Sequence, residues 1–169
     1  MKKDSEGQFE VFNSIVQQTD NFCWTLDKPE STMSLGSTLT KYFPDLGILL
    51  LNGPLGAGKT TLVKGIAKSL SINEPITSPT FPLCQHYPYG SPPLIHIDLY
   101  RFEEENAANE FFLQEEEESK ATGALMVIEW PERLSLPITD AWRGELGYST
   151  DNQSRLFQLK PPVELDSKL

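Results

Sequence analysis

The sequence predicts an α/β fold: a three-layer sandwich in which helices cover both faces of a mixed, mostly parallel sheet that includes a C-terminal antiparallel hairpin. Two observations support this prediction. An apolar run at 46–51 leads through a glycine-rich loop at 53–60 into a helical pattern. Farther along, apolar runs at 92–98 and 124–129 each end on an acid and enclose a helical segment. Strand–helix–strand order favours parallel pairing, so ligand chemistry is expected at the carboxyl ends of these strands.

The segment before the glycine-rich loop predicts one strand and one helix. Residues 22–26 read as a short strand, since they mix aromatic and apolar side chains. A helix is expected over 29–42, because Pro29 suits a first helical turn and apolar residues then recur at helical spacing. Pro44 and the residue after it end that helix.

The segments after the loop predict an irregular stretch, an acidic helix and a hairpin. Residues 76–82 contain two prolines, so we expect an ordered loop or an edge strand. The acidic stretch 103–118 is expected to form a solvated helix face, with a docking surface for a basic partner as the alternative. The strands 142–148 and 155–160 flank a polar turn, which predicts an antiparallel hairpin at a sheet edge.

Length and composition favour one folded domain. The chain has 169 residues, of which 38% are hydrophobic, enough for one core and short for two. We expect a single domain over 22–162, preceded by an extension of uncertain order over 1–21 and followed by a polar tail over 163–169.

Charge and hydropathy restrict the partners and the compartment. The net charge of −10 repels phosphate backbones, so any role with RNA is expected to pass through a partner. No apolar stretch approaches the roughly 18 residues that a membrane span needs, and the first residues lack the apolar region of a signal peptide. The sequence therefore predicts a cytoplasmic protein that makes no membrane contact.

The two cysteines offer no metal or redox motif by themselves. Cys23 and Cys84 lie far apart and neither belongs to a CxxC pair, which fits a reducing compartment. His86 is two residues from Cys84, and a single pair of this kind is more often structural than metal-binding. We therefore expect no site at either cysteine.

The glycine-rich loop carries the strongest motif of the chain. It reads G-x-x-x-x-G-K-T between a strand and a helix, the order that a phosphate-binding P-loop requires. Glycines let consecutive backbone N–H groups point at phosphate oxygens, Lys59 adds a positive charge and Thr60 offers a hydroxyl to Mg²⁺. A P-loop NTPase-like fold that binds a nucleoside triphosphate is therefore expected. The expected nucleotide-binding residues of this segment are Gly53, Leu55, Gly56, Ala57, Gly58, Lys59, Thr60 and Thr61.

A second protein ligand for Mg²⁺ is expected at a strand end. Nucleotide-bound Mg²⁺ keeps several waters and takes one or two protein oxygens, commonly the loop threonine and a nearby acid. Asp98 and Glu129 both end apolar strands. The residues alone leave the choice between them open.

Four motifs together resemble one family. Besides the P-loop, the chain contains S-P-T-F at 78–81, H-I-D-L-Y-R at 96–101 and I-E-W-P-E at 128–132. Their order and spacing are similar to those of the TsaE family, the small ATPases of bacterial tRNA threonylcarbamoyladenosine (t6A) biosynthesis. The resemblance covers roughly residues 22–160 and includes T-x-x-L-G at 32–36.

The resemblance implies an ATPase that assembles with TsaD and TsaB, whose complex modifies tRNA, while TsaE itself meets tRNA only indirectly. It implies ATP and Mg²⁺ as cofactors. Matched motif by motif, the implied roles are Mg²⁺ binding for Thr60 and Glu129, catalysis for Lys59 and for Asp98 at the attacking water, a nucleotide-sensing loop for Ser78 and Thr80, and nucleotide contact for Thr32, Trp130 and Glu132.

The chain departs from the family pattern in two places. Pro54 stands where the loop of the family usually carries an acid, and the acidic segment after Arg101 replaces a leucine- and glycine-rich helix signature. The first departure leaves a non-catalytic, nucleotide-dependent switch module as the main alternative. A small-molecule kinase is a weaker alternative, because Arg101, Arg133 and Arg143 are isolated and suggest no arginine-bearing lid.

Overall fold

A computed structural model describes residues 16–18, 21–150 and 152–163. Within these residues the chain forms three α-helices, one short 3₁₀ helix and eight strands. In chain order the elements are β1 (Val16–Gln18), β2 (Asn21–Leu26), α2 (Pro29–Tyr42), β3 (Ile48–Asn52), α3 (Lys59–Ser69), β4 (Cys84–Tyr87), β5 (Leu94–Asp98), α4 (Glu105–Thr122), β6 (Leu125–Glu129), η1 (Pro131–Arg133), β7 (Trp142–Tyr148) and β8 (Arg155–Lys160).

All eight strands belong to one sheet with the order β1-β2-β8-β7-β3-β6-β5-β4. The four central strands, β7, β3, β6 and β5, pair in parallel. The outer strands pair antiparallel, with β1, β2 and β8 on one side and β4 on the other. The P-loop NTPase-like sandwich with a mixed sheet is confirmed. The sheet is less parallel than predicted, because three of the seven strand pairings among the described residues are parallel and four are antiparallel.

The hairpin of β7 and β8 lies inside the sheet, so the prediction of an edge position was wrong. On one side β7 pairs in parallel with β3, and on the other side β8 pairs antiparallel with β2. Strand β1 then extends the sheet beyond β2. The reason is long-range pairing: β2, distant in sequence, covers the free edge that the hairpin alone would leave exposed.

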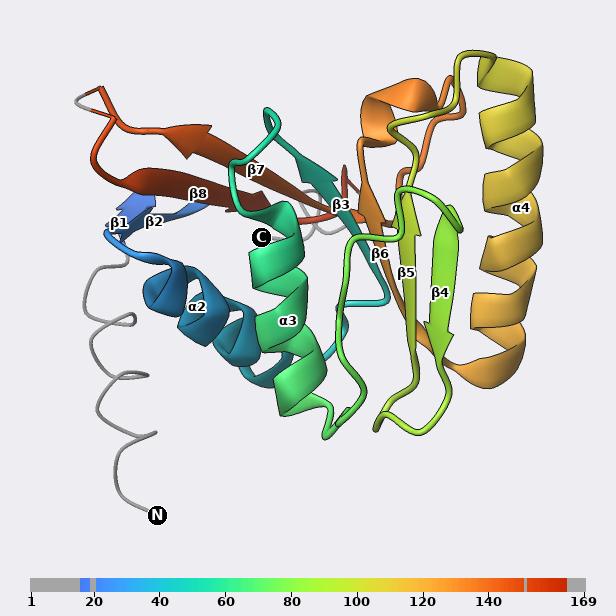
Figure 1. The fold of residues 1–169 in the computed structure, drawn as a ribbon, viewed down its shortest axis with the longest axis horizontal. Helices are drawn as coiled ribbons and strands as arrows, with labels where there is room; N and C mark the ends of the chain where they lie inside the picture. Colours follow the sequence, from blue (N-terminus) through green and yellow to red (C-terminus); the bar gives the residue numbers. More distant parts are fainter. Residues whose placement is uncertain (1–15, 19–20, 151, 164–169) are drawn as a thin grey trace.

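Helices cover both faces of the sheet, with α2 and α3 on one face and α4 on the other (Figure 1). Side chains of β3 alternate between the two cores. Leu49 and Leu51 pack in the core beneath α2 and α3, whereas Ile48 and Leu50 pack in the core beneath α4. All four are buried, as expected for a central parallel strand.

Helices α2 and α3 cross with almost no space between their backbones. A Cβ atom added to Gly36 would lie 2.2 Å from the carbonyl oxygen of Leu62, and one added to Gly65 would lie 2.0 Å from that of Met33. The hydroxyl of Ser37 donates to the carbonyl of Gly65 at 2.8 Å. This close crossing fixes the position of α3, and therefore of the loop at its N-terminus.

The remaining expectations have mixed outcomes. Residues 76–82 form a loop rather than an edge strand. Strand β1 falls inside the predicted extension 1–21, whose residues 1–15 and 19–20 lie outside the described residues, as do 164–169 of the predicted tail. No helix in the described ranges is long and apolar enough to cross a membrane.

We expect Gly36→Ala to lower the free energy of unfolding by about 3 kcal/mol, because its methyl group meets backbone atoms that cannot move aside. Gly47→Ala is the matched control, since a Cβ there meets nothing within 4 Å. Urea unfolding of both variants measures the difference. Equal stabilities would show that the helices separate at no cost.

Candidate functional site

The loop between β3 and α3 has the backbone of a phosphate cradle. Gly53, Gly56 and Gly58 have φ values of 143°, 77° and 105°, which side-chain-bearing residues rarely adopt. A Cβ on Gly53 would also lie 2.4 Å from the carbonyl oxygen of Leu146 on β7. Gly58 is the N-cap of α3, so the loop opens onto the N-terminus of this helix, where anions bind favourably.

Lys59 is buried and folded back over the loop. Its Nζ donates to the carbonyl oxygens of Gly53 at 2.6 Å and Pro54 at 3.1 Å. Burial lowers the pKa of this ammonium below its usual value. The nearby carboxylates partly offset this effect, because each of them raises the pKa; they belong to Glu129, Glu132 and Asp98. The ammonium is thus bound by two carbonyl oxygens of its own loop, with three carboxylates close enough to favour its charge.

Trp130 lies against Lys59. The ammonium is 4.1 Å from the centroid of the indole ring, a favourable cation–π distance. Trp130 has a φ of 61°, unusual for a bulky residue, and its backbone N–H donates to the carbonyl of Leu51 at 3.3 Å. In this backbone conformation the ring lies against Lys59. Glu132, two residues after Trp130, is one of the carboxylates that raise the pKa of the same lysine.

Thr60 and Glu129 meet across two elements. The Thr60 hydroxyl donates to Glu129 Oε1 at 2.9 Å, and the same oxygen lies 2.9 Å from Nε2 of buried His96. A buried carboxylate needs such partners, because its charge has lost the hydration of water. Of the two strand-end acids, Glu129 rather than Asp98 therefore accepts a hydrogen bond from the loop threonine.

Asp98 organises the loop that follows α3. The hydroxyls of Ser78 and Thr80 donate to Asp98 Oδ2 at 2.9 Å and 2.5 Å, and the Tyr100 N–H donates to Oδ1 at 2.9 Å. The Asp98 N–H in turn donates to the carbonyl of Leu83 at 2.9 Å. The carboxylate thus links the end of β5 to the loop that carries both hydroxyls.

A cavity of about 230 Å³ adjoins the P-loop. It is bounded by the β2–α2 connection, the P-loop and the start of β8. Its lining includes Thr32 and Thr61, both predicted to contact nucleotide, and Asp27 and Arg155, which sequence reasoning missed. Trp130 and Glu132 are absent from its lining, so the cavity gathers only part of the predicted nucleotide contacts.

Comparison with known proteins identifies the family. The model of the threonylcarbamoyl adenosine biosynthesis protein TsaE matches residues 26–156. The chain belongs to the TsaE family. The Nostoc sp. tRNA threonylcarbamoyladenosine biosynthesis protein TsaE is 45% identical over 121 residues, 72% of this chain and 73% of the relative. That of Mycobacterium bovis is 41% identical over 118 residues, 66% of this chain and 69% of the relative.

A solved structure has a similar fold. Bacillus subtilis YdiB superposes with a TM-score of 0.68 at 26% identity, covering 90% of this chain and 93% of that one. The fold of the present chain thus has a counterpart among solved structures.

The donor atoms of this TsaE chain suit a magnesium–nucleotide complex. The Thr60 hydroxyl and the Glu129 and Asp98 carboxylates are hard oxygen ligands, the type that Mg²⁺ prefers. The glycine cradle and Lys59 suit the phosphates. Leu55 is exposed on the rim of the loop, and its carbonyl accepts a hydrogen bond from Tyr148 at 3.2 Å, which ties the loop to β7.

Two features were missed from the sequence. Arg155 is the first residue of β8 and Asp27 lies between β2 and α2, and neither belongs to a motif, so only the fold brings them to the loop. His96 gave a usable signal: it is a polar residue in a buried strand, two positions before Asp98, and therefore faces the same side of the sheet.

We expect Glu132→Gln to lower the pKa of Lys59 further below its usual 10.5, because it removes a negative charge that favours the ammonium. NMR titration of the lysine side-chain signals, assigned with Lys59→Arg, measures this change. Glu110→Gln on α4 serves as the control and leaves the titration where it is. An unchanged Lys59 pKa in Glu132→Gln would show that the carboxylate does not act on the loop lysine.

Proposed function

We propose that this chain is an ATPase that binds ATP with Mg²⁺ at the P-loop and hydrolyses it in support of tRNA threonylcarbamoylation. The observation that supports this most is the convergence of the Thr60–Glu129 pair, Lys59 and Asp98 beside one glycine cradle. A structural role alone gives no reason to collect a buried lysine and several carboxylates at the N-terminus of a helix.

Each residue has a task in this proposal. Lys59 exchanges the carbonyls of Gly53 and Pro54 for phosphate oxygens, and Thr60 and Glu129 hold Mg²⁺, which supplies positive charge to the phosphates. Asp98 orients the attacking water and accepts its proton. The hydroxyls of Ser78 and Thr80 hold the Asp98 carboxylate in position, so their loop responds to the state of the nucleotide.

The cavity lined by Thr32, Thr61, Asp27 and Arg155 is the proposed site of the nucleoside. It lies next to the glycines of the loop and offers both charged and hydroxyl side chains. With the nucleoside bound in this cavity, the phosphates would lie along the loop, and the terminal phosphate would point toward Lys59 and Asp98. Trp130, on the Lys59 side, then supports the lysine rather than stacking on the base.

The pathway is proposed from the relatives, which are named for tRNA threonylcarbamoyladenosine biosynthesis. We infer that the chain works as an accessory of a TsaD–TsaB transferase complex and meets tRNA through these partners. Its net charge of −10 supports this indirect role, because the overall field opposes contact with a phosphate backbone.

A non-catalytic switch module is the second candidate, and Pro54 is the observation that favours it. Proline brings neither the carboxylate usual in the family nor a backbone donor. The carbonyl of Pro54 nevertheless accepts a hydrogen bond from Lys59, so the cradle keeps its shape. Nucleotide binding without turnover would support the switch, whereas turnover without any acceptor molecule would exclude a small-molecule kinase.

We expect Asp98→Asn to keep ATP binding and to lose hydrolysis by roughly 100-fold or more, because the amide cannot accept the proton of the attacking water. Steady-state phosphate release and equilibrium nucleotide binding are measured in parallel. Asp45→Asn, an exposed position between α2 and β3, is the control. Equal hydrolysis in Asp98→Asn and the parent chain would remove Asp98 from the mechanism.

A further inference from the structure

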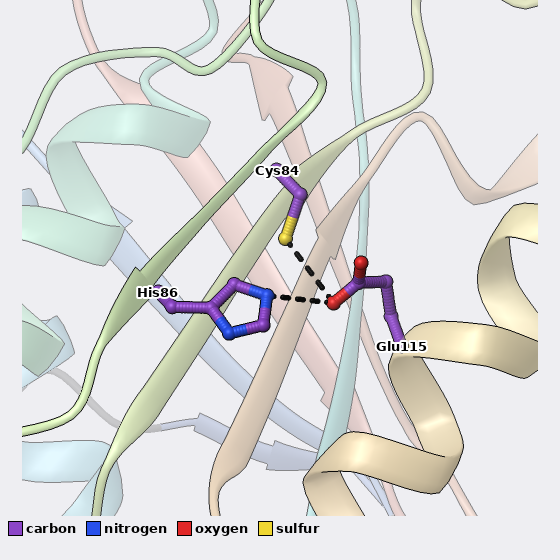
Figure 2. Close-up of side chains that lie close together, drawn as sticks. All are labelled: Cys84, His86 and Glu115. Carbon is purple, nitrogen blue, oxygen red and sulfur yellow. Dashed lines mark hydrogen bonds and ion pairs between the residues drawn. The ribbon is translucent and has the colours of Figure 1, made fainter.

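Cys84, His86 and Glu115 form a second cluster, on the face of the sheet that α4 covers. Cys84 and His86 are alternate residues of β4, so both point to the same side of this edge strand. Glu115 reaches them from α4, and Figure 2 shows the three side chains pointing toward one another. Glu115 Oε2 lies 2.7 Å from His86 Nε2 and 3.5 Å from Cys84 Sγ.

Glu115 is an unusual residue for its position. It lies on the side of α4 that packs against the sheet, together with Ala108, Phe112 and Ser119, and the residue as a whole is 8% exposed. An apolar side chain would pack there without losing hydration, whereas a carboxylate is costly unless it is partnered. The partners that it finds are an imidazole and a thiol, both of which are metal ligands.

We propose that Cys84, His86 and Glu115 bind a divalent transition-metal ion, and that the ion is Zn²⁺. The three donor atoms already lie within 4.8 Å of one another. Thiolate sulfur, imidazole nitrogen and carboxylate oxygen are the ligands that Zn²⁺ takes, at about 2.3, 2.0 and 2.0 Å. Tetrahedral geometry with these bonds separates the donors by roughly 3.3–3.5 Å, so small side-chain rotations admit the ion.

The fourth position of the ion is open to water. The side chain of His86 is 44% exposed, whereas that of Glu115 is 10% exposed, so the cluster opens to solvent on the strand side. Three protein ligands and one water give Zn²⁺ its usual coordination number of four.

Ion binding changes the contact between the thiol and Glu115. Without an ion, the Cys84 thiol donates a hydrogen bond to Glu115 Oε2 at 3.5 Å. On binding, the thiol proton passes to solvent and the thiolate forms a bond to Zn²⁺, whose charge compensates both anions.

The site would connect the edge strand to the helix that covers it. β4 lies at the end of the sheet and β5 is its neighbour there, with α4 packed nearby (Figure 1). The cluster shares no residue with the P-loop, Asp98 or Glu129, so the proposal does not depend on ATP hydrolysis. Cys84 directly follows Leu83, whose carbonyl accepts the Asp98 N–H, which places the ion at the end of the Ser78–Thr80 loop.

Cobalt binding to the full chain tests the proposal. Titration of the purified, metal-free protein with Co²⁺ is expected to give a thiolate-to-cobalt charge-transfer band with a stoichiometry of one, which Zn²⁺ then removes by displacement. This band requires a cysteine ligand, so Co²⁺ bound at the nucleotide site does not contribute to it. Cys23→Ser is the matched control and is expected to keep the band.

Ligand variants give the second part of the test. Cys84→Ser is expected to abolish the band, and His86→Gln to weaken Zn²⁺ binding by more than about 100-fold, since loss of even an outer-shell partner costs 10–100-fold. Zn²⁺ should raise the thermal midpoint of the parent and of Cys23→Ser but not of Cys84→Ser. His86 is partly exposed, so its variant keeps the test valid if Cys84→Ser fails to fold. Absence of the band in the parent, or its persistence in Cys84→Ser, would show a hydrogen-bonded cluster without a metal.

Discussion

The in-register parallel pairing of β3, β6 and β5 is the constraint on which the nucleotide site depends. Leu51 is paired with Glu129, and Glu129 with Asp98, so the three strands end at the same level. Backbone hydrogen bonds continue this alignment past the strands, from Leu99 to Glu129 and from Trp130 to Leu51. A shift of one residue in either pairing would turn the affected carboxylate to the face of α4, away from the loop.

The same alignment buries two carboxylates, and hydrogen bonds from neighbouring groups offset the cost of their lost hydration. Glu129 and Asp98 are almost fully buried, at 3% and 2% exposure, and a buried carboxylate without partners is strongly unfavourable. Thr60 and His96 are the hydrogen-bond partners of Glu129. Two hydroxyls and one backbone N–H donate hydrogen bonds to Asp98. The site is therefore preorganised: the groups proposed to hold Mg²⁺ and water are already placed, and ligands replace contacts that exist.

Much of the fold could be predicted from the sequence because its signals are local. Apolar runs, proline positions and helical spacing predicted the three α-helices and six of the eight strands within a few residues, whereas β1 and β4 were not predicted. The glycine pattern of the P-loop predicted the loop backbone. The position of the hairpin could not be predicted, since it depends on β2 pairing with β8 from the far end of the chain. For the same reason the residues alone left Asp98 and Glu129 unranked. The family resemblance implied Mg²⁺ binding for Glu129, and the hydrogen bond from Thr60 places that carboxylate beside the loop threonine. The Cys84 cluster escaped sequence reasoning because Glu115 lies far along the chain from Cys84, on a helix that the fold places over β4.

The central claim is that these aligned strand ends form a working ATPase. Steady-state ATP hydrolysis by the purified full chain tests it most directly, measured with and without Mg²⁺ and with and without added TsaD and TsaB. The account predicts phosphate release that requires Mg²⁺ and rises when the partners are added. Tight nucleotide binding without phosphate release under every condition would contradict it, and would leave the chain as a nucleotide-dependent switch in which Pro54 has replaced the acid of the loop.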